Sequence, residues 1–94
     1  MRLSISEINT FKTKLHSLSP EAKLYLFGSR TDDDRKGGDI DLLIVSKDLT
    51  KRDLRLLRID FFDKFGEQKL DIVLDDGTFK NPFNKMIYQK AVLL

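Results

Sequence analysis

The apolar residues of this chain follow two different spacings. In three segments they recur every three or four residues, as on one face of an α-helix. These segments are residues 5–18, 51–65 and 81–94. Ser4 or Ser6 can cap the first, Asp48 or Thr50 can cap the second, and Gly66 is a natural stop for the second. The pattern therefore predicts three helices.

Between these segments lie three short apolar runs, which predict β-strands. They are residues 23–27, 39–45 and 69–74. The middle run is apolar on both faces, since Leu43 and Val45 alternate with Leu42 and Ile44, and this is typical of a central strand. A long helical connection predicts that the second and third strands are parallel, whereas a short loop predicts that the first is antiparallel to the second. Residues 29–36 of that loop have room for one or two helical turns.

The order of these elements predicts an α/β (α+β) fold in which helices pack on a small mixed sheet of three to four strands. With 94 residues, 40% of them hydrophobic, residues 1–94 are expected to form a single domain. The absence of cysteine excludes disulfides and cysteine-bound zinc, and the formal net charge of +2 gives no reason to expect direct nucleic-acid binding. No apolar run reaches membrane-spanning length, and we expect a cytoplasmic protein.

Acidic residues stand where two of the strands begin. Asp39 and Asp41 are two positions apart, so they lie on the same side of their strand. With the predicted strand directions, Asp71 and the glycine turn at Gly28 and Ser29 come to the same edge of the sheet. Three carboxylates at such close range repel one another unless a cation lies between them.

The chemistry expected at this edge follows from the ligand types. Oxygen ligands without histidine or cysteine favour Mg²⁺ or Mn²⁺, and such sites commonly share the metal with substrate phosphates. Gly28 can present backbone N–H groups to a phosphate, Ser29 can add a hydroxyl donor and Arg30 a positive charge. The combination favours phosphoryl or nucleotidyl transfer.

The motif Gly28-Ser29, nine intervening residues, then Asp39-Ile40-Asp41 and a later strand residue Asp71 resembles the DNA polymerase β nucleotidyltransferase superfamily. It is most similar to the minimal members, the MNT-type proteins. The resemblance implies that Asp39, Asp41 and Asp71 bind two divalent ions, and that Asp71 also assists deprotonation of the attacking hydroxyl. It further implies that Gly28, Ser29 and Arg30 hold the β- and γ-phosphates. The spacer is one residue shorter than is usual for the family, which we expect to alter the loop rather than the chemistry.

The same resemblance implies a role for the protein. Minimal members are commonly antitoxins paired with small helical HEPN-type proteins, and some transfer AMP from ATP to a tyrosine of that partner. We therefore expect AMP transfer from ATP to a hydroxyl of a partner protein, and self-association is left open. The alternative is a non-catalytic nucleotide-binding module that neutralises its partner by contact. Partner docking is expected on the basic flank of residues 51–58 and on the apolar C-terminal residues 87–94.

Several charged residues also have simpler interpretations. Asp39 can cap its strand, and Asp71 can pair with Lys69 or Arg35. Asp75 and Asp76 precede a glycine and are predicted to be turn residues. A solvated helix face is the simplest interpretation of four basic residues, Lys51, Arg52, Arg55 and Arg58.

Overall fold

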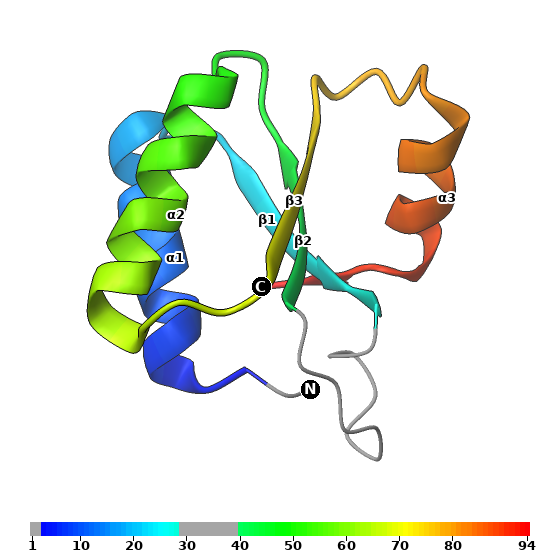
Figure 1. Cartoon of the computed structure of the whole chain (residues 1–94). Helices are drawn as coiled ribbons and strands as arrows, with labels where there is room; N and C mark the ends of the chain where they lie inside the picture. Colours follow the sequence, from blue (N-terminus) through cyan, green and yellow to red (C-terminus); the bar gives the residue numbers. More distant parts are fainter. Residues whose placement is uncertain (1–2, 29–39) are drawn as a thin grey trace.

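The computed structural model describes residues 3–28 and 40–94, which form a sheet with helices on both faces (Figure 1). The elements are α1 (Ile5–Leu18), β1 (Lys23–Phe27), β2 (Ile40–Val45), α2 (Lys51–Phe65), β3 (Leu70–Asp75), α3 (Pro82–Lys90) and β4 (Val92–Leu93). The strand order is β3-β2-β1-β4. β2 and β3 are parallel, and β1 is antiparallel to both β2 and β4. The predicted fold class and strand directions are confirmed.

Local hydrogen bonds explain where the two long helices begin. At α1, the Ser4 hydroxyl accepts from the Glu7 amide at 3.1 Å, and the Glu7 carboxylate accepts from the Ser4 amide at 3.0 Å. Thr50 and Asp53 form the same reciprocal pair at the start of α2. Each pair satisfies backbone donors that the first turn of a helix leaves free. The sequence offered two candidates at each helix start, and the structure selects Ser4 and Thr50.

The sheet has an apolar core on each face. On one face, α1 and α2 cover Leu42 and Ile44 of β2, and the rings of Phe11 and Phe61 stack with their centroids 4.1 Å apart. On the other face, Leu43 packs with Tyr25 of β1 and with Ile87 of α3. The central strand β2 is thus covered on both sides, as its sequence predicted. Within the described residues, no helix is both long enough and apolar enough to cross a membrane.

The C-terminal segment differs from the prediction of one helix over residues 81–94. α3 ends at Lys90, and Val92 and Leu93 form the edge strand β4 beside β1. The Leu94 amide continues this pairing by donating to the Leu24 carbonyl at 2.9 Å. Pairing with β1 satisfies backbone groups that would otherwise remain at an open sheet edge, and this outweighs the helical pattern of the sequence. The helical turns predicted at residues 29–36 lie outside the described residues.

Through its side chain, Asp75 takes part in the turn that the sequence predicted, but the residue itself belongs to the strand. It ends β3 and is only 5% exposed. Its carboxylate accepts from the Gly77 amide at 2.7 Å, from the Phe79 amide at 3.2 Å and from the Asn84 side-chain amide at 3.0 Å. Asp75 therefore fixes the connection between β3 and α3, which explains a buried carboxylate at this position.

We expect the Phe61→Ala variant to lose about 3 to 5 kcal/mol of unfolding free energy, because it empties a fully buried site stacked on Phe11. Phe83→Ala is the matched control. Phe83 is 55% exposed, so its substitution should lower the unfolding free energy by about 0.5 kcal/mol or less. Urea unfolding measures both. Equal losses in the two variants would contradict the assignment of the core.

Candidate nucleotidyl-transfer site

Three strand ends meet at one edge of the sheet. β1 ends there at Phe27, and β2 and β3 both begin there. In the sheet register Asp41 is the partner of Phe27 on one side and of Asp71 on the other. Paired residues on neighbouring strands are about 5 Å apart, so the two acids lie side by side. The predicted convergence of Asp41 and Asp71 is confirmed.

Both carboxylates are on the α3 side of the sheet. Side chains alternate along a strand, so Asp41 shares its face with Leu43, which packs in the α3 cluster. Asp71 likewise shares its face with Val73 of that cluster. Asp41 is half-buried and Asp71 is exposed. The pair therefore faces the side of the sheet that carries α3, and the other side is covered by α1 and α2 (Figure 1).

Gly28 lies directly against Asp41. Its φ is +78°, and a Cβ at this position would overlap with Oδ2 of Asp41 and lie 3.0 Å from Cγ. A side chain at residue 28 would displace the carboxylate as well as strain the backbone. The sequence suggested Gly28 for its access to phosphate. The structure adds a second requirement, which is room for the carboxylate of Asp41.

The beginning of β3 is fixed from both sides. The Ile40 amide donates to the Lys69 carbonyl at 3.0 Å, which joins the starts of β2 and β3. On the outer edge, Nη2 of Arg58 donates to the Leu70 carbonyl at 3.0 Å. Arg58 is thus not part of the solvated flank that the sequence predicted for it, whereas the other three basic residues of that flank are exposed. Arg58 contacts the residue immediately before Asp71, and helical spacing alone could not predict this contact.

The predicted site is only partly within the described residues. Gly28, Asp41 and Asp71 are described and lie together at one edge. Ser29, Arg30 and Asp39 are outside the described residues. Among residues 3–28 and 40–94, no group of three acidic, histidine or cysteine side chains is placed to hold a metal ion. The described part of the site therefore contributes two adjacent carboxylates and a glycine.

The contact between Gly28 and Asp41 can be tested with a pair of substitutions. Gly28→Ala should destabilise the wild-type chain by more than it destabilises the Asp41→Ala variant, because the second change removes the overlapping oxygen. Gly66→Ala is the matched control: its φ is +82°, but apart from its two chain neighbours no atom in the described part of the chain lies within 4 Å of the added Cβ. It should cost about 1 to 3 kcal/mol of unfolding free energy from backbone strain alone, because the positive φ combined with a ψ of 164° is a conformation that almost only glycine adopts. If Gly28→Ala costs the same in both backgrounds, the contact is refuted.

The comparison with protein families agrees with this geometry. The model of the family described as nucleotidyltransferase domain matches residues 8–92, which include β1, β2 and β3 and residues 29–39 between β1 and β2. A search of curated proteins finds no match. The matched segment covers most of the chain and contains the edge at which Gly28, Asp41 and Asp71 meet. The chain therefore belongs to the nucleotidyltransferase domain family.

Proposed function

We propose that this protein transfers AMP from ATP to a hydroxyl of a partner protein, with Mg²⁺ or Mn²⁺ as cofactor. The observation that carries the proposal is the register pairing of Asp41 with Asp71 beside Gly28. A nucleotidyltransferase domain needs carboxylates next to a place for phosphates, and this edge supports both requirements. The partner we propose is a small helical HEPN-type protein, with this chain as the antitoxin of the pair.

The described residues fit a divalent cation. Asp41 and Asp71 offer carboxylate oxygens on adjacent strands, and hard oxygen donors suit Mg²⁺ and Mn²⁺. Two neighbouring carboxylates also repel each other, so a cation between them lowers the cost of keeping both ionised. We assign Asp39 as the third ligand because the motif places it two residues before Asp41. When bound, the metal would neutralise charge on the triphosphate.

The residues of the chain have separate roles in the proposed reaction. Gly28, Ser29 and Arg30 bind the β- and γ-phosphates. The acceptor oxygen attacks the α-phosphorus and forms a new ester bond, while the bond from the α-phosphorus to the bridging oxygen breaks and pyrophosphate leaves. Asp71 accepts the proton from the acceptor hydroxyl. Exposure of Asp71 supports this role, because an acceptor must be able to reach it.

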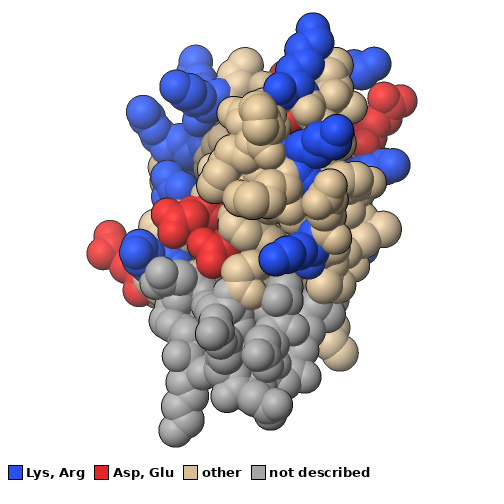
Figure 2. Space-filling model, turned by 90° about the vertical axis from the view of Figure 1, so that its right-hand side faces the viewer, with Lys and Arg blue, Asp and Glu red and all other residues tan. Residues whose placement is uncertain are grey.

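The direction of approach favours one of the two expected docking surfaces. The basic flank of α2 is on the opposite face of the sheet from the acids, whereas α3 and β4 are close to the face on which they lie. Tyr88, Val92 and Leu93 are exposed apolar residues of this C-terminal surface. Figure 2 views the α3 side and shows acidic side chains just above the grey segment, with a broad uncharged surface among basic side chains. We therefore propose that the partner docks on the C-terminal surface.

The first test of this proposal is nucleotide binding. ATP with Mg²⁺ should raise the melting temperature, by the equivalent of about 2.7 kcal/mol at a hundredfold excess over the dissociation constant. Asp41→Asn and Asp71→Asn should each abolish most of this shift, because each removes a metal ligand. Asp63→Asn is the matched control, since Asp63 is an exposed acid on α2. A full shift in both site variants would contradict the proposal.

The second test is transfer itself. The chain is incubated with ATP, Mg²⁺ and the protein encoded by the neighbouring gene, and intact-mass spectrometry should show one or more added adenylates on that protein. Asp41→Asn should prevent the modification and Asp63→Asn should not. If the partner stays unmodified and the Asp41→Asn variant still neutralises it, the non-catalytic binding module is established instead.

A further inference from the structure

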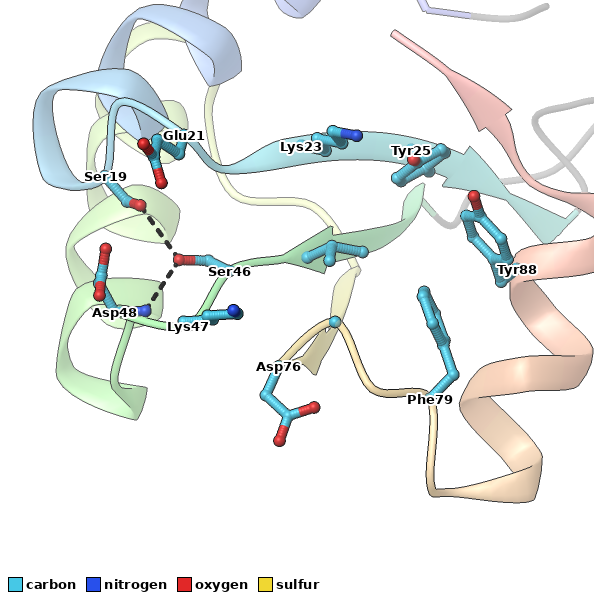
Figure 3. A pocket seen from close by; sticks show the side chains of 12 residues that line it. Ser19, Glu21, Lys23, Tyr25, Ser46, Lys47, Asp48, Asp76, Phe79 and Tyr88 are labelled. Atoms are coloured by element: carbon cyan, nitrogen blue, oxygen red, sulfur yellow. Dashed lines mark hydrogen bonds between the residues drawn. The ribbon is translucent and has the colours of Figure 1, made fainter.

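A pocket lies at the end of the sheet opposite to Gly28 and Asp41. It has a volume of about 440 Å³, which is within the range of small-molecule sites. Five segments contribute to it: the α1–β1 turn, β1, the end of β2 with the loop that follows, the β3–α3 loop, and α3 (Figure 3). A second hollow of about 360 Å³ shares Ser46, Lys47 and Asp76 with it. None of the residues assigned to nucleotidyl transfer lines either one.

The topology of the sheet explains why a pocket forms here. β2 and β3 are parallel neighbours, so their carboxyl ends lie together at this edge. The chain leaves β2 for α2 on one face and leaves β3 for α3 on the other (Figure 1). Connections that diverge from adjacent parallel strands open a crevice between them, and ligands in open α/β sheets commonly bind at such a point. This argument is independent of the acidic edge at the amino ends of the same strands.

One wall of the pocket is aromatic. The rings of Phe79 and Tyr88 lie with their centroids 4.4 Å apart, and Tyr88 meets Tyr25 edge-on at 5.3 Å. Phe79 has a φ of +51°, and the bond from its amide to Asp75 helps to hold this unfavourable conformation. The Tyr88 side chain is 42% exposed, so ring surface remains available for stacking. Burial and the neighbouring Tyr88 hydroxyl raise the pKa of the Tyr25 phenol above its ordinary value.

Positive charge lies next to this wall. In Figure 3 the Lys23 side chain extends along β1 toward Tyr25, and the Lys47 side chain extends into the pocket from the loop after β2. Neither ammonium group forms an ion pair with another described residue. The carboxylate of Asp76 is turned away from the wall and accepts from the Thr78 amide at 2.9 Å and from the Thr78 hydroxyl. An anionic group between the aromatic wall and the rest of the pocket would therefore have, in the same pocket, two ammonium groups that form no ion pair with other described residues.

The far end of the pocket is polar and uses hydroxyl groups. The hydroxyls of Ser19 and Ser46 are hydrogen-bonded at 3.1 Å, and Ser46 also accepts from the Asp48 amide at 3.1 Å. One bond between two hydroxyls uses only one of their protons, so one O–H donor remains for a ligand. The carboxylates of Glu21 and Asp48 lie at this end and can accept from ligand hydroxyls (Figure 3).

We propose that this pocket is a second binding site, for a small molecule that carries a flat ring and an anionic group. The ring would stack on Tyr88 and Phe79, and the anionic group would lie between Lys23 and Lys47. Nucleoside monophosphates and hydroxylated aromatic acids both have this chemistry. The site shares no residue with the proposed metal and phosphate site and does not depend on a metal ion. Tyr88 lines the pocket and also belongs to the C-terminal surface proposed for partner docking.

The test is an NMR titration of the ¹⁵N-labelled chain in the presence of EDTA, which removes metal-dependent binding at the acidic edge. AMP and 4-hydroxybenzoate carry both ligand features, adenosine lacks the anion and ribose 5-phosphate lacks the ring. AMP, 4-hydroxybenzoate or both should shift the amides of Ser46, Lys47 and Gly77 saturably, while those of Gly28 and Asp41 stay in place. Binding of AMP alone would identify a nucleotide site. Binding of both ligands would identify a broader site for aromatic anions. The two incomplete ligands should bind at least about tenfold more weakly.

Substitutions make the test specific to the pocket. Lys23→Gln and Lys47→Gln should each weaken binding about tenfold, as expected for one charge-assisted hydrogen bond, and both residues are exposed, so the fold should be retained. Lys85→Gln is the matched control, because Lys85 is an exposed lysine of α3 that does not line the pocket. The proposal is overturned if neither complete ligand saturates, if the shifts appear at Gly28 and Asp41, or if Lys47→Gln binds as tightly as the wild type.

Discussion

The parallel pairing of β2 with β3 is the constraint on which the rest of this structure depends. It places Asp41 opposite Asp71, and the same register brings Val45 opposite Asp75 at the other end. A shift of one residue would turn one of the two acids into the α1–α2 core, because successive side chains point to opposite faces. The register is held by apolar residues on both faces of β2, so the packing of the core also determines the geometry of the site.

The two ends of the parallel pair have different chemistry. At the amino ends, two carboxylates and the close approach of Gly28 make an acidic edge that suits a metal and a triphosphate. At the carboxyl ends, the acid at the corresponding position, Asp75, is buried and used to hold the β3–α3 loop. Aromatic rings and lysines line the space beside that loop. The two proposed sites therefore lie at opposite ends of the same pair of strands.

Much of the fold could be predicted because its signals are local. The spacing of apolar residues located α1, α2 and the first three strands, and the lengths of the connections gave the strand directions. The C-terminal strand β4 could not be predicted, because its partner is the edge of β1, almost seventy residues earlier in the chain. The roles of Arg58 and Asp75 were missed for a similar reason, since each depends on partners that tertiary packing supplies. For the site, the predicted strand directions brought Gly28, Asp41 and Asp71 to one edge, but no sequence pattern indicated that Gly28 must leave room for the carboxylate.

The central claim is that Asp41 and Asp71 act together on one ion, and a double-mutant cycle of Mn²⁺ affinity tests it most directly. The dissociation constant is measured in the presence of ATP for the wild type, Asp41→Asn, Asp71→Asn and the double variant. If both carboxylates bind the same ion, each single substitution should cause most of the loss of Mn²⁺ affinity. The double variant should then bind Mn²⁺ only slightly more weakly than either single variant. Losses that simply add, or the absence of any loss in one single variant, would contradict the account.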